Sequence, residues 1–341
     1  MTDPITAPAL PVSSTTILEL PYHRLYRAQP TYRWWRPLVA IVMTVVFFFA
    51  VSFAVAIPVL IGLFATGTID LNNPASLSQD ALLELLAPDM ARPWTLLFGL
   101  GSIILVLPLV PLALRIAGIR PAGVRVSILH SVLFRLRWRW LFVTLGLSAL
   151  VWVVTLVAQL AIGVAGGEPI GQFTTDPTTY VISLIIVLLL VPIQAATEEY
   201  LYRGVLLQSV GAWLRWAPFG VVISAVLFAV SHSYDGWGLL QVGLMGVGFA
   251  IVTVRTGGLE AGIAFHTVNN VGSFALAGTG AFGPTGMTTE TGGPIAVIGQ
   301  LVTVVLWVGV VELFARRQKV ENLSRIAVPS ADPGMLAPHG S

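Results

Sequence analysis

Residues 195–204 read AATEEYLYRG, and they directly follow the apolar run YVISLIIVLLLVPI at residues 180–193. No turn signal separates this run from the two glutamates and the arginine. Moving an ionisable side chain into hydrocarbon costs about 2.5–3.5 kcal/mol on insertion scales. Three such side chains between residues 198 and 203 are therefore expected to pair, to contact water or to take part in chemistry. The remaining segments are interpreted as the structure that surrounds these three side chains.

The composition of the 341-residue chain is typical of a polytopic helical membrane protein. It is 56% hydrophobic and only 10% charged, and its mean hydropathy is +0.85. The chain has no cysteine, which excludes disulfides, thiolate nucleophiles and Cys-ligated metals. The first 30 residues lack the apolar core of a signal peptide, so the first hydrophobic segment is expected to act as an uncleaved anchor.

Apolar segments long enough for helices recur along the chain. They predict an all-α polytopic membrane protein, a bundle of about eight transmembrane helices. The segments lie at residues 37–64, 93–114, 140–164, 178–202, 217–234, 237–254, 258–277 and 294–315.

The distribution of positive charge predicts the orientation of this bundle. The connections on one side carry Arg24, Arg27, Arg33, Arg36, Arg115, Arg120, Arg125, Arg135, Arg137, Arg139, Arg215, Arg255, Arg316, Arg317, Lys319 and Arg325. The opposite connections carry Arg92 alone as a positive charge, together with eight of the sixteen acidic residues: Asp70, Asp80, Glu84, Asp89, Glu168, Asp176, Asp235 and Glu290. We therefore expect a multi-pass protein of the cell membrane with both termini in the cytoplasm. The arginines near the N-terminus are attributed to this topology, with no nucleic acid as partner.

The predicted organisation has five parts. Residues 1–36 form a disordered or interfacial tail, with Tyr22 and Tyr26 in an aromatic belt. Residues 37–177 hold the first three helices, residues 178–277 the core, residues 278–317 a loop and the eighth helix, and residues 318–341 a disordered tail. Within the second part we expect a short helix near 78–86 capped by Ser78, and an amphipathic helix on the inner membrane face within 115–139.

Helical geometry separates the two glutamates. Glu199 and Arg203 are spaced i, i+4, so they lie on one face and are expected to form an ion pair. Glu198 lies about 100° around the helix and lacks that partner. Glu198 is therefore the carboxylate expected to act as a general base.

The five histidines divide into two groups. His23, His130 and His339 lie in tails or loops, where a solvated role is expected. His232 and His266 fall within apolar segments, and Asn270 follows His266 by one helical turn. We expect these three residues to share a site with Glu198.

Other polar and small residues in the apolar segments have structural interpretations. Gly258 and Gly262 are expected to let their helix approach a neighbour closely. Glu260 and Glu312 lie near the ends of their segments, where they are expected to pair with Arg255 and Arg316, respectively.

Three motifs on this segment resemble those of the CPBP family, which includes the CAAX-processing type II endopeptidases and the bacteriocin-processing Abi proteins. The motifs are EExxxR (Glu198, Glu199, Arg203), FxxxH (Phe228, His232) and HxxxN (His266, Asn270). Their order and spacing fit the family over residues 178–277. Tyr202 stands where the family often has phenylalanine.

The resemblance implies intramembrane hydrolysis of a peptide bond in a membrane-embedded or lipidated protein, such as a prenylated CAAX substrate. It implies that Glu198 and His232 hold and deprotonate the attacking water. It implies that His266 and Asn270 stabilise the oxyanion, with Glu199, Arg203 and Phe228 as supporting residues.

Metal use is a separate question, because the family has been described both as metalloproteases and as glutamate-type proteases. Glu198, His232 and His266 are the candidate ligands if zinc is bound. The chain has no HExxH motif, and we favour a mechanism without a tightly bound metal. The sequence leaves the substrate, the depth of the site and the oligomeric state open.

Two other classes of function remain. A proton- or ion-coupled transporter could use the same polar cluster as a relay. Against it, the sequence shows no internal repeat of the kind that transporters have. A non-catalytic membrane scaffold could recruit partners through its basic loop and tails.

Overall fold

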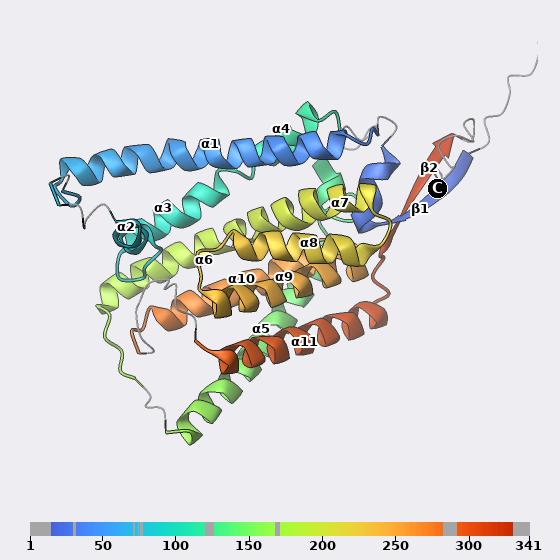
Figure 1. Ribbon diagram of the computed structural model, residues 1–341. Helices are drawn as coiled ribbons and strands as arrows, with labels where there is room; N and C mark the ends of the chain where they lie inside the picture. The colour runs from blue at the N-terminus through green and yellow to red at the C-terminus, as the bar shows by residue number, and fades with distance from the viewer. Residues whose placement is uncertain are drawn as a thin grey trace, which may run out of the picture.

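The computed structural model describes residues 15–29, 32–70, 72–73, 75, 78–119, 126–167, 171–281 and 292–329. Helices dominate, and the long ones run alongside one another as one bundle (Figure 1). The elements are, in order, β1 (Thr15–Pro21), η1 (Tyr22–Ala28), α1 (Arg36–Ala65), α2 (Gln79–Leu86), α3 (Pro93–Ile104), α4 (Leu109–Ile116), η3 (Val126–Leu129), α5 (Trp138–Ala165), α6 (Pro177–Glu199), η4 (Tyr200–Leu207), α7 (Gln208–Trp213), α8 (Ala217–Val230), α9 (Gly236–Thr256), α10 (Glu260–Ala277), α11 (Pro294–Arg317) and β2 (Leu323–Pro329).

Six helices of the described residues are long and apolar enough to cross a membrane. Each of the eight expected segments coincides with a helix, but two fall short of these criteria. Helix α8 has only 14 residues, because the polar run 231–235 reverses the chain and Asp235 caps α9 by accepting from Gly238 N at 2.8 Å. Helix α10 carries Glu260, His266, Asn269 and Asn270, which lower its hydropathy. The count of eight and the orientation of the termini stay predictions.

Residues 195–204 lie in the longest helical segment of the described residues, Pro177–Trp213. Asp176 caps its start by accepting from Thr179 N at 2.8 Å, and Pro177 occupies the first turn. The helix widens to a π-helix over Tyr200–Leu207. The expected end at residue 202 was therefore wrong, since the helix continues to Trp213. Such π segments are often found at functional sites.

The two tails were expected to be disordered, but part of each is ordered. Strands β1 and β2 form an antiparallel pair, with Leu18 opposite Ile326. Tyr22 and Tyr26 of η1 are fully buried instead of lying in an interfacial belt. The Tyr22 hydroxyl donates to the Leu129 carbonyl at 2.5 Å. These contacts supply the buried area and backbone partners that the tail sequence lacks by itself.

The inner loop contains no long amphipathic helix in its described residues, 115–119 and 126–139. Its apolar side chains instead pack into the protein core, where Ile128, Leu129 and Val132 are buried beside η1. Only the short 3₁₀ turn η3 forms there. The expected helix near residues 78–86 is confirmed as α2, and Ser78 Oγ accepts from Ala81 N at 3.2 Å.

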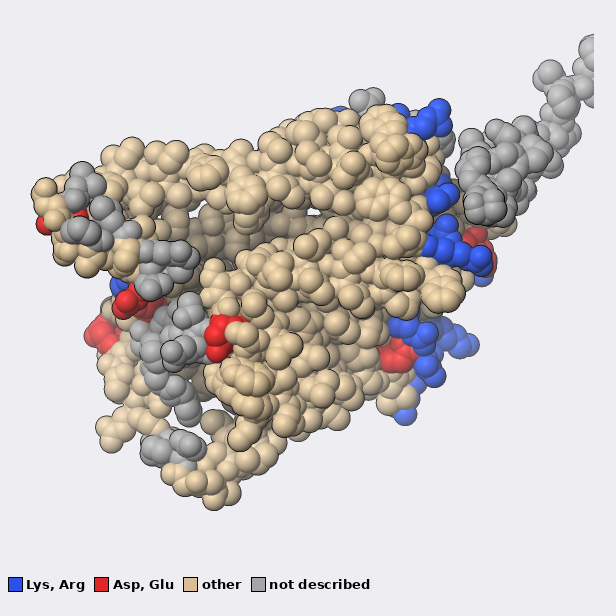
Figure 2. All heavy atoms as spheres, in the orientation of Figure 1, with Lys and Arg blue, Asp and Glu red and all other residues tan. Residues whose placement is uncertain are grey.

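The packing of the core brings distant segments together. Helix α6 packs against α3 and α10, α8 packs against α9 and η4, and α9 packs against α11. The arginines and the lysine gather at the end of the bundle where β1 and β2 lie, whereas most visible acidic residues lie toward the other end (Figure 2). This separation agrees with the charge asymmetry noted in the sequence.

Candidate active site

Glu199 and Arg203 form the predicted ion pair, and both side chains are completely buried. Arg203 Nη1 donates to Glu199 Oε1 at 2.9 Å, and Nη2 donates to the Gly246 carbonyl at 2.9 Å. The guanidinium also lies over the rings of Phe228 and Phe249, at 4.5 and 5.1 Å from their centroids. These contacts offset the cost of desolvating the two charges. The pair is therefore a rigid support within the site.

His266 joins the two glutamates. Its Nδ1 lies 3.1 Å from Glu199 Oε1, and its Nε2 lies 3.3 Å from Glu198 Oε2. The imidazole stacks on Phe249 with 5.1 Å between ring centroids. The contact with Glu199 is a hydrogen bond, in which Nδ1 donates to the carboxylate, whereas Glu198 Oε2 has no hydrogen-bond partner among the described residues. His266 is thus fixed in place between two acids.

A glycine permits this close approach of α10 to α6. A Cβ added at Gly262 would lie 2.9 Å from Glu199 Oε2, which is closer than real Cβ contacts. The expectation that Gly262 lets its helix approach a neighbour is confirmed, and the neighbour is the helix that carries the two glutamates.

Glu198 differs from Glu199 in its environment. Its side chain keeps 11% of its surface exposed and has no ion pair with Arg203 among the contacts of the described residues, whereas Glu199 is fully buried. The predicted separation of the two acids by helical geometry is therefore present in the structure. Glu198 is the more exposed of the two carboxylates.

His232 lies outside α8, in the turn that follows it. Its Nδ1 lies 2.7 Å from the Phe228 carbonyl oxygen, and its ring stacks on Tyr234 with 5.7 Å between centroids. A carbonyl only accepts, so Nδ1 carries the proton of this hydrogen bond. In the neutral ring, Nε2 then has a free lone pair that can accept from water.

Asn270 reaches the cluster through a residue that the sequence analysis did not single out. Its Nδ2 donates to Gln194 Oε1 at 3.4 Å, and its Oδ1 accepts from Asn269 Nδ2 at 3.3 Å. Gln194 is buried one helical turn before Glu198, on the same face of α6. That i, i+4 spacing was the signal that could have revealed it.

Phe228 connects the two histidines. Its ring centroid lies 4.8 Å from that of His232 and 5.8 Å from that of His266. All three motifs thus meet around one aromatic ring, although their helices are separated in the sequence.

The candidate zinc ligands were Glu198, His232 and His266. Within the described residues, no group of three or more His, Asp or Glu side chains could hold a metal ion. The expected mechanism without a tightly bound metal stays a prediction.

Two histidines expected to be solvated are partly or fully buried. His23 is 4% exposed, with Nε2 3.5 Å from the Arg215 carbonyl. His130 Nδ1 hydrogen-bonds the Tyr200 hydroxyl, and its carbonyl accepts from Leu259 N. Helix η1 and the inner loop fold back onto the other helices, which buries His23 and leaves His130 partly exposed. His339 lies outside the described residues.

The expected partner of Glu260 was wrong, whereas that of Glu312 is confirmed. Glu260 is completely buried and pairs with Arg137 at 2.7 Å, because the inner loop passes over the start of α10. Arg255 instead pairs with Glu312, at 2.5 Å, and Glu312 also accepts from Arg316.

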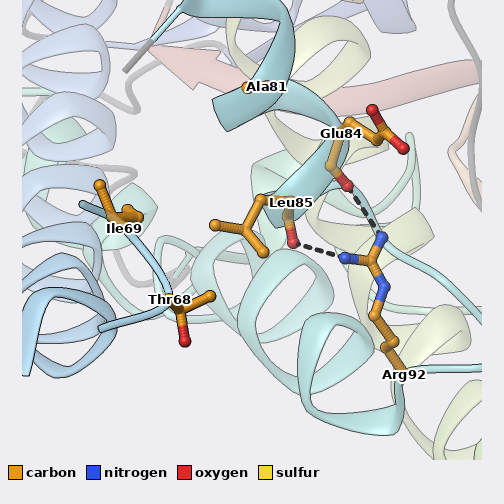
Figure 3. Close-up of a pocket in the computed structure, with 6 residues that line it drawn as sticks. All are labelled: Thr68, Ile69, Ala81, Glu84, Leu85 and Arg92. Atoms are coloured by element: carbon orange, nitrogen blue, oxygen red, sulfur yellow. Dashed lines mark hydrogen bonds between the residues drawn. The ribbon is translucent and has the colours of Figure 1, made fainter. Parts of the chain in front are cut away.

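A small open pocket of about 260 Å³ lies elsewhere, between α2 and the end of α1, and Arg92 lines it (Figure 3). The Arg92 guanidinium donates to the Glu84 and Leu85 carbonyls, at 2.8 and 3.2 Å, and to Asp89 at 2.9 Å. This cation closes the C-terminal end of α2, so it is not available to a ligand. None of the motif residues lines this pocket.

The fold and the buried Glu–His–Arg cluster define a polytopic helical membrane protein with an enclosed polar site. Residues 177–272 match the family model described as type II CAAX prenyl endopeptidase Rce1-like, which confirms the resemblance of this segment to the CPBP family. The matched segment contains every motif residue, from Glu198 to Asn270.

A curated relative is similar over part of the chain. It is the "Uncharacterized protein YyaK" of Bacillus subtilis (strain 168), 25% identical over 142 residues. The alignment covers 40% of this chain and 47% of the relative, so the chain spans about half the length of that protein. No solved structure matches.

Proposed function

We propose that this protein is an intramembrane endopeptidase in which Glu198 activates water for the hydrolysis of a peptide bond. One observation carries the proposal: the more exposed of the two adjacent glutamates faces His266, which the buried Glu199–Arg203 pair holds in place. This arrangement lies within the segment that matches the Rce1-like family. The roles below are assigned to these residues on that basis.

The reaction begins with water bound between Glu198 and His232 Nε2. Glu198 takes a proton from the water as its oxygen attacks the carbonyl carbon of the substrate. A positioned base of this kind contributes about 10²–10⁴-fold to the rate. When the tetrahedral intermediate collapses, the C–N bond breaks and Glu198 returns the proton to the leaving amine.

The oxyanion of that intermediate needs hydrogen-bond donors. Asn270 Nδ2 retains a second N–H beyond the one given to Gln194. His266 gives its Nδ1–H to Glu199, so it donates to the oxyanion through Nε2 in the form that carries a proton on both ring nitrogens. A single donor of this kind is worth about 10²–10³-fold. Glu199 and Arg203 do not touch the substrate in this mechanism; they hold His266.

The substrate is a peptide or protein held at the membrane, either embedded or lipidated, with a prenylated CAAX tail as the candidate that the family suggests. The positively charged end of the bundle supports an orientation with both termini in the cytoplasm (Figure 2).

This orientation can be measured with single cysteines, because the chain has none of its own. We expect a cysteine introduced at Gln318 to be shielded from a membrane-impermeant maleimide in intact cells, and one at Asn73 to react. The reverse pattern contradicts the orientation.

The activity is tested with the purified protein in liposomes and a farnesylated CAAX peptide, beside the same peptide without the lipid. We expect cleavage by the wild type and none by Glu198→Gln. We also expect a zinc chelator to leave the rate unchanged. A transporter would instead show substrate-dependent ion flux without cleavage.

A further inference from the structure

A chain of hydrogen bonds connects the π-helix η4 to the turn that carries His232. The Tyr202 hydroxyl donates to Ser231 Oγ at 2.7 Å, and Ser231 Oγ donates to the Phe228 carbonyl at 2.7 Å. The same carbonyl lies 2.7 Å from His232 Nδ1. The proposed mechanism uses neither Tyr202 nor Ser231.

The direction of every bond in this chain is fixed. The Phe228 carbonyl can only accept, so Ser231 commits its single hydroxyl proton to it. Ser231 Oγ can then only accept from Tyr202, which must donate. Two donors thus converge on one carbonyl oxygen, and one of them is His232 Nδ1–H.

Tyr202, at the start of this series of hydrogen bonds, is held in place by its own packing. Tyr202 lies next to Arg203, and its ring packs edge-to-face on Phe228 with 5.1 Å between centroids. It therefore belongs to the same rigid cluster as the Glu199–Arg203 pair. Ser231 and His232, by contrast, follow the last residue of α8, where the His232 amide makes a single 3₁₀-type hydrogen bond to the Ala229 carbonyl at 3.0 Å.

We propose that Tyr202 is a positioning residue for His232. Through Ser231, its hydroxyl fixes the turn after α8, so that the His232 ring keeps its proton on Nδ1 and presents Nε2 to the attacking water. Phenylalanine at this position would keep the ring packing and lose the anchor. The inference rests on the proposed function, since it assigns His232 the role of holding water.

The kinetic test compares Tyr202→Phe, Ser231→Ala and the double variant with the wild type. Each single variant should lower kcat about 10-fold with KM unchanged, because small displacements of a catalytic group cost up to about 10²-fold. The double variant should be no slower than either single one, because both changes break one link. Effects that multiply, or a Tyr202→Phe enzyme with wild-type kcat, overturn the proposal.

The matched control is Tyr32→Phe, which removes a tyrosine hydroxyl that donates to the Ala212 carbonyl at 3.2 Å, outside the site. It should keep wild-type kcat. A loss equal to that of Tyr202→Phe overturns the proposal, because any lost hydroxyl would then have the same effect.

A second readout does not need activity. In protein labelled with ¹⁵N-histidine, the ring signals of His232, assigned by their absence in His232→Gln, report which nitrogen is protonated. We expect the Nδ1–H form to dominate in the wild type and to decrease in Tyr202→Phe. An unchanged His232 spectrum in Tyr202→Phe overturns the positioning role. If the wild type cleaves no peptide, the proposed function fails, and this spectrum still decides the inference.

Discussion

His266 and Glu199 are joined through one oxygen: His266 Nδ1 lies 3.1 Å from Glu199 Oε1, which also accepts from Arg203 Nη1 at 2.9 Å. The position of the imidazole therefore depends on a fully buried ion pair. The second oxygen of Glu199 faces Gly262. Helix α10 therefore packs against α6 at the site itself, where Gly262 leaves room for the Glu199 carboxylate.

Replacing Gly262 tests whether this close packing of α10 on α6 is needed for activity. In Gly262→Ala the new methyl group would lie 2.9 Å from Glu199 Oε2, and it should push α10 and His266 away. We expect kcat to fall at least about 10-fold. The control is Gly309→Ala in α11, where no atom lies within 4 Å of an added Cβ. The control should keep full activity and gain up to about 1 kcal/mol in stability from helix propensity. Equal activity of the two variants contradicts the account.

Two arginines that pair with glutamates should differ sharply in their effect on the free energy of unfolding. Arg137→Ala leaves the completely buried Glu260 without its cation, which costs about 3–5 kcal/mol. Arg255→Ala removes a side chain that is 53% exposed, and such pairs contribute about 0–1 kcal/mol. Equilibrium unfolding in detergent measures both. Similar losses in the two variants would show that Glu260 is not buried as described.

The stability of the protein should depend on pH through His23. Burial lowers the pKa of His23 from 6.5, and nearby Arg24 lowers it further, while the hydrogen bond with the Arg215 carbonyl opposes the shift. The unfolded chain therefore takes up a proton as the pH falls through about 6.5, whereas the folded protein resists it. Stability should be complete above pH 6.5 and should decrease below it.

The melting temperature of His23→Gln should accordingly change less between pH 7.5 and pH 5.5 than that of the wild type. Some dependence should remain, because burial also lowers the pKa of His130. Identical pH dependence in His23→Gln and wild type contradicts the burial of this ring.

The site could be predicted from sequence because charged residues within apolar segments are rare and helical spacing assigns their faces. The pairing of Glu199 with Arg203 and the separation of Glu198 followed from positions within one helix. The convergence of His266 with Glu198 followed from the resemblance to known motifs.

The predictions that failed concern contacts between residues that are far apart in the sequence. Strand β1 pairs with β2 at the other end of the chain, and neither sequence alone indicates a partner. Glu260 was assigned to Arg255, its neighbour in sequence, whereas Arg137 reaches it from a loop far along the chain. The π-helix at Tyr200–Leu207 has no signal in the amino-acid composition. The early end of α8 at Val230 was not predicted, because apolar residues fill most of the segment 217–234.

The most direct test of the account is the rate of peptide cleavage by Glu198→Gln, measured in liposomes beside wild type and the exposed control Glu321→Gln. The account predicts cleavage by wild type and Glu321→Gln, no detectable cleavage by Glu198→Gln, and equal unfolding midpoints for all three. A folded Glu198→Gln protein that cleaves at the wild-type rate would contradict it.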